Sequence, residues 1–200
     1  MARTAAPAPG RQALKTQRTR ARLLEATLGL IRERGFAAAT ATAIARRAGI
    51  TWGAAQHHFG SKEEILEEIL ALAYARFLAA MSAPGLLGGS RGRRAAALVR
   101  RMWDHYQSDH YRVSLEILRA TRGARRQRAR AWEQRQGRAH LMVVRQVFPE
   151  SGLSDAQLRE ALTFAHCCLT GLAIERIFEA RVSHIDRHLK RIARLLQAML

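Results

Sequence analysis

A short stretch from Thr40 to Lys62 carries side chains whose chemistry suits hydrogen bonding to bases and phosphates. Gln56 can bond adenine through two atoms, and the methyl group of Ala54 can contact the methyl group of thymine. Hydroxyl groups at helix starts and a lysine ammonium suit phosphate oxygens. The candidate contacts to DNA are Thr40, Thr42, Thr51, Trp52, Ala54, Gln56, His57 and Lys62.

These candidates divide by the part of DNA that each suits. Thr40, Thr42 and Lys62 are predicted to contact phosphates, because they lie at or near predicted helix starts. Gln56 is the strongest candidate for a contact to a base edge. Trp52 either packs on the sugar–phosphate backbone or covers the fold, and both interpretations stay open.

Two short helices that meet at a sharp corner would position these side chains. Thr40 suits a helix N-cap, and Ile44 and Ala48 recur at helical spacing behind it. Gly49 can adopt the left-handed conformation that ends a helix, and Thr51 can cap the next one. This is the pattern of a helix-turn-helix, whose second helix enters the DNA major groove. An ordinary helical corner is the alternative.

The pattern resembles the N-terminal domain of the TetR family of transcriptional regulators, over residues 18–72. The matching residues are Ile44-Ala45, Ala48-Gly49-Ile50-Thr51, Gly53, His58-Phe59 and Ser61-Lys62, with Gly35-Phe36 before them. Many family members carry Tyr at the position of Gln56, so the family's contact to DNA is not carried over there. The resemblance implies a connecting helix, a body that senses a small molecule, and a homodimer built from the last two helices.

Composition favours an all-α chain that is attracted to polyanions. Strong helix formers dominate the 200 residues, and β-branched residues are sparse. The formal net charge is +18, and much of the excess is arginine, which suits phosphate geometry. The alternative explanation is that the arginine content reflects a GC-rich genome.

The positions of Gly, Pro and helix-capping residues predict four segments. They are a disordered basic tail (1–15), a helix-turn-helix domain (16–62), a connecting helix (63–82) and a helical ligand-binding and dimerisation domain (83–200). The helices predicted outside the corner span about 16–34, 61–81, 93–107, 111–120, 121–148, 154–180 and 185–200. The basic tail either reaches along the duplex or contributes only nonspecific charge.

The family resemblance makes the apolar and aromatic residues of the body candidates for an effector pocket. An aromatic-lined cavity with few polar groups would suit a hydrophobic ligand. The candidates are Met102, Trp103, Tyr106, Tyr111, His140, Phe148, Phe164, Cys167 and Cys168. Ordinary core packing requires the same residue types and is the alternative for each.

The helix predicted over 154–180 is apolar on two faces, so it needs two surfaces to bury against. One surface is its own domain, and the other is predicted to be a second copy of the chain. A thick monomer core is the alternative.

Motifs for catalysis and for metal binding are missing from the sequence. It holds no G-x-S-x-G, no Walker-type loop and no H-E-x-x-H pair. His184 and His188 lie four residues apart and could share a metal, but no third ligand is obvious. We therefore predict no catalytic residue, no cofactor and no metal, although an enzyme housed in the helical body stays an alternative.

Cysteine usage and hydropathy predict a soluble, cytoplasmic protein. Cys167 and Cys168 are neighbours in a predicted helix, so they point in different directions and cannot pair with each other. The N-terminal tail has no apolar signal region, and no stretch is long and apolar enough to span a membrane.

Together these features predict a homodimeric, TetR-like repressor of transcription. A small, largely hydrophobic ligand would release it from a palindromic operator in double-stranded DNA. The alternative is a ligand-independent, architectural DNA-binding protein driven by charge.

Overall fold

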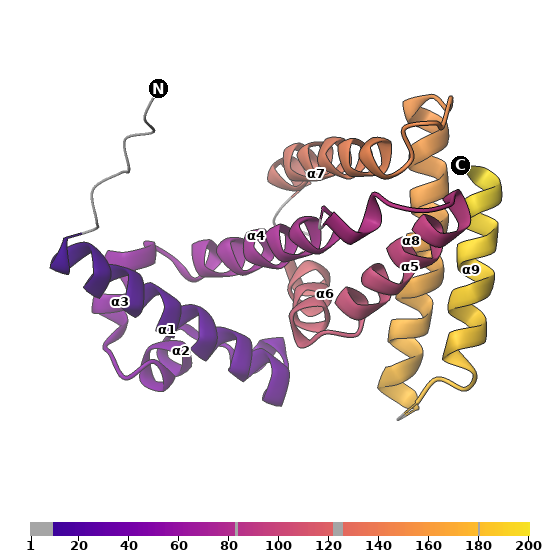
Figure 1. The fold of residues 1–200 in the computed structure, drawn as a ribbon. Helices are drawn as coiled ribbons and strands as arrows, with labels where there is room; N and C mark the ends of the chain where they lie inside the picture. Colours follow the sequence, from indigo (N-terminus) through magenta and orange to yellow (C-terminus); the bar gives the residue numbers. More distant parts are fainter. Residues whose placement is uncertain (1–9, 83, 122–125, 180) are drawn as a thin grey trace, which may run out of the picture. The chain divides into compact units, whose positions relative to one another are not determined.

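A computed structural model describes residues 10–82, 84–121, 126–179 and 181–200, without the side chains of residues 84, 126–136 and 177 (Figure 1). Over these ranges the chain is helical and contains no strand, which confirms the all-α prediction. The helices are α1 (Arg11–Arg34), η1 (Phe36–Ala38), α2 (Ala41–Arg47), α3 (Trp52–Phe59), α4 (Lys62–Met81), η2 (Pro84–Leu86), α5 (Arg91–Tyr106), α6 (Asp109–Thr121), α7 (Arg126–Val147), α8 (Asp155–Phe178) and α9 (Ile185–Met199).

The chain forms two compact units that are discontinuous in sequence. The first unit runs to Leu72 and includes Val113–Ala120, and the second holds Ala73–Arg112 and Thr121–Leu200. Helices α4 and α6 therefore each contribute residues to both units. The sequence pattern did not indicate that part of α6 joins the N-terminal unit.

The first unit is built on α1, which packs against η1, α2 and α3. Leu23 and Ile31 of α1 are fully buried, together with Ile44 of α2 and Ile65 of α4. Gly35 ends α1 with a φ of 78°, and its N–H donates to the carbonyl of Ile31 at 2.9 Å. A positive φ costs glycine little, so the chain can turn here into η1.

Helix α1 begins at Arg11, earlier than the predicted start near Thr16. Residues 11–15 read RQALK, which are good helix formers without Pro or Gly, so the helix extends N-terminally as far as Gly10. The rest of the predicted basic tail, residues 1–9, lies outside the described residues.

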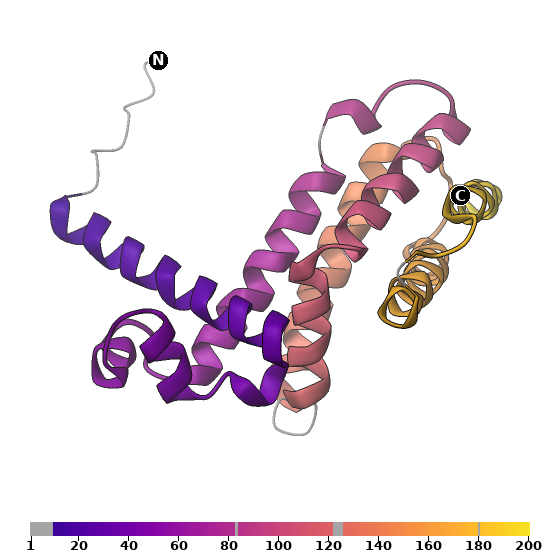
Figure 2. The ribbon, with the colours of Figure 1, turned by 90° about the horizontal axis from the view of Figure 1, so that it is seen from below.

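The second unit is a helical body in which α5 packs most extensively on α9 and also contacts α8. Figures 1 and 2 both show α8 and α9 side by side. Ser154 and Gln157 form a capping box at the start of α8, as the sequence predicts. The buried residues that hold these helices together include Leu98, Leu158, Leu169 and Leu196.

Helices α5 and α6 each begin two residues before the predicted start, at Arg91 and Asp109. Helix α5 begins at Arg91, because the hydroxyl of Ser90 caps it by accepting the N–H of Arg93 at 3.3 Å. Helix α7 begins at Arg126, after residues 122–125, which lie outside the described ranges. Among the described residues, no helix has the length and apolar character needed to cross a bilayer.

Candidate nucleic-acid interface

Helices α2 and α3 meet at the corner that the sequence predicts. The hydroxyl of Thr40 accepts the N–H of Ala43 at 3.2 Å, and that of Thr51 accepts the N–H of Ala54 at 3.2 Å. Gly49 turns the chain between the helices with a φ of 67°. Because each threonine satisfies a helix start, the two helices are separate elements and form a helix-turn-helix.

One side of α3 is buried and the other is exposed. Ala55 and Phe59 are 0% and 3% exposed and face the core. Gln56 and His57 are exposed, while Trp52 is half-buried. The other predicted DNA contacts that are exposed are Thr40, Thr42, Thr51 and Ala54. The structure thus brings six of the predicted residues to the exposed surface of the corner, available to a ligand as large as a duplex.

Lys62 is placed differently from these residues. It is half-buried, and its ammonium nitrogen lies 4.7 Å from the centroid of the Phe36 ring. This is a cation–π contact, which holds the ammonium group on the ring. A phosphate contact by Lys62 requires the side chain to leave Phe36.

Arg46 was not among the predicted contacts, although it is exposed at the last turn of α2. Its neighbour Arg47 bonds both carboxylate oxygens of Glu33, at 2.6 and 2.7 Å, and this lowers the pKa of Glu33 to about 2. Arg47 is thereby engaged within the unit. In the sequence, two adjacent arginines directly before the turn already indicated that this surface carries an additional positive charge.

A line of cations follows one face of α1. Arg11, Lys15, Arg18 and Arg22 are exposed and are spaced by four, three and four residues, so they share one side of the helix. Arg22 also donates to the carbonyl of Ala48 at the end of α2. A helical face of this charge attracts a polyanion.

Arg20, on the half-buried side of α1, fastens the end of α3. It donates to the carbonyl of His58 and pairs with Glu68 of α4. Its guanidinium carbon lies 3.9 Å from the centroid of the Phe59 ring. Two of these interactions hold the C-terminal end of α3, and the third joins α1 to α4.

Glu116 of α6 accepts the N–H of Phe36 at 3.0 Å, and both residues belong to the first unit. Phe36 opens η1, where the first N–H groups of a helix lack intrahelical partners. Glu116 thus bonds α6 to η1 within the first unit, and the sequence pattern gave no sign of it.

The second unit contains a cavity of about 290 Å³. It is lined by Phe77, Met81, Leu98, Met102, Tyr106, Gly137, His140, Val143, Val144, Leu162, Thr163 and His166. Three predicted ligand contacts are among them: Met102, Tyr106 and His140. The described residues that line this cavity include no Asp, Glu, Lys or Arg, so its wall is largely apolar.

The other predicted ligand contacts lie elsewhere in the second unit. Trp103 and Phe148 are 4% and 1% exposed, as core residues are. The Tyr111 hydroxyl bonds that of Thr170 at 2.9 Å. Phe164 and Cys168 are half-buried, and Cys167 is exposed; both thiols are unpaired.

Burial keeps the titratable groups of this cavity neutral. It lowers the pKa of His140 to about 4 and also lowers that of His166. It raises the pKa of Tyr106, whose hydroxyl bonds Nδ1 of His166. Nε2 of His140 is buried without a hydrogen-bond partner. The cavity therefore suits an uncharged or apolar group at neutral pH.

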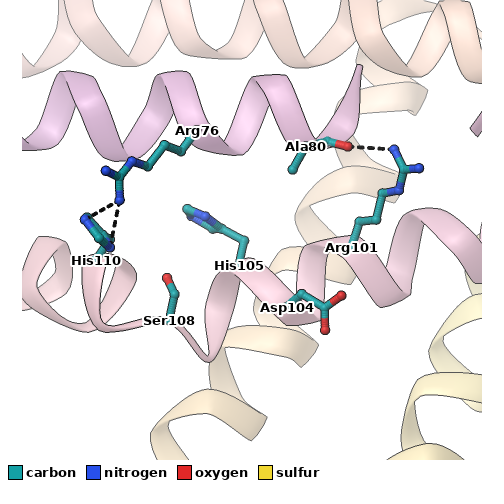
Figure 3. A pocket seen from close by; sticks show the side chains of 7 residues that line it. All are labelled: Arg76, Ala80, Arg101, Asp104, His105, Ser108 and His110. Atoms are coloured by element: carbon teal, nitrogen blue, oxygen red, sulfur yellow. Dashed lines mark hydrogen bonds between the residues drawn. The ribbon is translucent and has the colours of Figure 1, made fainter. Parts of the chain in front are cut away.

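A second pocket in the same unit, called the polar pocket below, is lined mostly by residues with polar or charged side chains. Its volume is about 420 Å³, and Arg76, Ala80, Arg101, Asp104, His105, Ser108 and His110 line it (Figure 3). The His105 ring packs against Phe77 of the apolar cavity with 4.9 Å between ring centroids. Among the described residues, no group of three or more His, Cys, Asp or Glu side chains could hold a metal ion.

Comparison with known proteins places the N-terminal unit among bacterial regulators. Residues 23–69 match the profile of "Bacterial regulatory proteins, tetR family". The chain is 41% identical over 59 residues to the transcriptional regulator SrpR of Pseudomonas putida, and 47% identical over 51 residues to the transcriptional repressor KstR2 of Mycobacterium tuberculosis. These stretches cover 30% and 26% of this chain, and 28% and 26% of the relatives.

The helical body resembles solved structures in fold. A crystal structure described as a TetR-family transcriptional regulator from Mesorhizobium loti superposes with a TM-score of 0.71. The superposition covers 93% of this chain and 96% of that one, at 16% sequence identity. At this identity the likeness shows the fold alone.

Proposed function

We propose that this chain, whose residues 23–69 match the profile of the tetR family of bacterial regulatory proteins, regulates transcription as a homodimer on a palindromic operator. Each subunit places α3 in the major groove of one half-site. The observation that carries this proposal is the exposed surface of α2 and α3, with Gln56 outward and the hydrophobic residues inward. We assign the chain no catalytic activity, and its place of action is the bacterial cytoplasm.

The charge of the first unit supports the assignment of DNA as partner. The cations along α1 and Arg46 of α2 are exposed and suit phosphate contacts. Phosphate contacts give affinity without sequence preference, whereas Gln56 supplies the contact to a base edge.

The dimer is proposed to form through α8 and α9. Cys167, Gly171, Ile174 and Phe178 recur along one face of α8 and are exposed, with Phe178 at 78% exposure. Leu195 of α9 is 53% exposed. A Cβ atom added at Gly171 meets nothing within 4 Å in the single chain, so this face has room for another helix. Apolar stripes of this kind are typical of subunit interfaces.

Release from DNA by a small molecule is proposed from the cavity of the second unit. Phe77 of α4 lines this cavity, and the same helix carries Glu68, which pairs with Arg20 in the first unit. A ligand that binds one arrangement of α4 more tightly therefore shifts the position of the helix that reaches the DNA-binding unit. The relative KstR2 is named a repressor, and we propose the same sign of regulation here.

The test is sequence-selective binding by the dimer. Fragments of source DNA are selected with the protein, and fluorescence anisotropy then compares the selected site, its single-base variants and random DNA at physiological salt. Gln56→Ala is expected to reduce discrimination at one base position by about 1–3 kcal/mol while affinity for random DNA stays the same. An equal loss on every sequence contradicts base reading by Gln56.

The net charge of +18 favours one alternative, a charge-driven architectural protein. The same titrations decide between the two functions. Similar affinities for selected and random DNA at physiological salt would contradict the function of a regulator and support that of an architectural protein.

A further inference from the structure

The polar pocket of the second unit lies where three helix segments converge. Arg76 comes from α4, Arg101 and His105 come from α5, and Ser108 and His110 stand at the start of α6 (Figure 3). All of its lining residues belong to the second unit. With a volume of about 420 Å³, the pocket is large enough for a small organic molecule.

The cations outnumber the acids in this pocket. Its lining holds two guanidinium groups, of Arg76 and Arg101, and one carboxylate, that of Asp104. Asp104 is exposed and accepts a hydrogen bond from Nε2 of Gln107 at 3.3 Å. Figure 3 shows Asp104 beside Arg101, whereas Arg76, His105, Ser108 and His110 surround the other end.

The end of the pocket near Arg76 has the hydrogen-bond donors that an anion needs. Nη1 of Arg76 bonds the His110 ring, with 3.1 Å to Nδ1. The guanidinium has five N–H donors, and its bonds to His110 use only this nitrogen. Helix α6 starts here with Ser108 as its cap, and a helix N-terminus favours negative charge. Asp109, in the same first turn, is paired with Arg112 at 3.0 Å.

The apolar part of a ligand also has a place beside this end. Ala80 and the face of His105 line the pocket, and His105 in turn packs on Phe77 of the apolar cavity. An anion alone would leave these surfaces uncovered, whereas an organic acid would cover them.

We propose that this pocket is a second effector site, separate from the apolar cavity, that it takes an organic acid, and that Arg76, with Ser108, binds the carboxylate or phosphate group of this ligand. This inference rests on the proposed function for its link to DNA release, but binding in the pocket can be measured without DNA. It assigns Arg76 as the residue that distinguishes acids from their neutral analogues.

Isothermal titration calorimetry on the full-length protein tests the assignment with three probes: octanoate, octanamide and inorganic phosphate. Octanoate and octanamide have the same chain and size, so the difference between them reports the charge. We expect octanoate to bind at least tenfold more tightly than octanamide, because charge-assisted bonds to Arg are strong. Phosphate binding without octanoate binding would identify an inorganic-anion site and contradict the proposal that the ligand is an organic acid.

Two variants locate the site. Arg76→Gln is expected to bring the octanoate-to-octanamide ratio to within about threefold. Arg100→Gln, the matched control on α5, removes an exposed arginine that bonds Asp186 at 2.8 Å outside the pocket, and it should leave the ratio unchanged. Thermal unfolding confirms that both variants fold. A wild-type protein that binds both probes equally, or neither, overturns the proposal, as does an unchanged ratio in Arg76→Gln.

DNA binding separates this inference from the proposed function. Operator affinity is measured for the wild type with and without each probe. Release of DNA by octanamide as effectively as by octanoate would overturn the acid site and leave the ligand-released regulator intact. Tight, Arg76-dependent binding of octanoate that leaves operator affinity unchanged would support the site and contradict release by this ligand.

Discussion

Replacing Arg20 by methionine should destabilise the first unit by about 2–6 kcal/mol. The cation–π contact with Phe59 contributes roughly 0.5–2 kcal/mol. The ion pair with Glu68 contributes roughly 0.2–1 kcal/mol, since its side chains are 33% and 35% exposed. The charged hydrogen bond to the His58 carbonyl contributes roughly 1.5–3 kcal/mol, and the loss of packing by the arginine stem is largely offset by methionine.

Urea-induced unfolding followed by circular dichroism measures the total loss, and amide hydrogen exchange locates it in α1 and α3. Glu68→Gln is the matched control, because it removes only the ion pair and should cost less than about 1 kcal/mol. The reasoning is refuted if Arg20→Met costs under about 0.5 kcal/mol, or no more than Glu68→Gln. It is also refuted if the accelerated exchange lies in α8 and α9 instead.

Three further predictions follow from the same structure. Lys62→Ala should weaken binding to all DNA sequences alike and flatten the salt dependence of the binding constant in anisotropy titrations, whereas a base-specific loss would contradict a phosphate role. The free energy of unfolding should fall as the pH drops from about 6.5 to about 4. Burial lowers the pKa of His140 to about 4, so over this range the unfolded chain takes up a proton on this histidine and the folded chain does not. His140→Gln should flatten that part of the thermal-unfolding profile, and an unchanged slope would exclude His140 as its source. If the chain forms the proposed dimer through α8, Ile174→Glu on the exposed face of this helix should convert it to monomer in analytical ultracentrifugation, and a dimer that persists in the variant would contradict this interface.

The helix-turn-helix could be predicted because its determinants are local. Thr40 and Thr51 cap the helices that follow them, and Gly49 permits the turn, so the pattern and the geometry coincide. The capping box at Ser154 was visible for the same reason. Side-chain exposure along α3 followed from helical periodicity alone.

Contacts between segments distant in sequence could not be predicted in this way. Glu116 bonds Phe36 across 80 residues, and Arg20 bonds Glu68 across 48. Polar residues of these types are usually exposed and give no periodic signal. Among the predicted ligand contacts, Met102 lines the cavity, whereas its neighbour Trp103 lies in the core. Both are apolar residues of one helix, so only the packing of the helices decides which of them a ligand could contact.

The membership of residues 113–120 in the N-terminal unit constrains how such regulators can be recombined. A chimera that joins residues 1–72 to the body of a relative would inherit whatever residue that relative carries in place of Glu116. Without an acceptor at this position, the N–H of Phe36 would have to hydrogen-bond to water, and the transplanted N-terminal unit would be less stable at η1. Transfer of the complete N-terminal unit between related chains therefore requires two segments, the one that ends at residue 72 and residues 113–120.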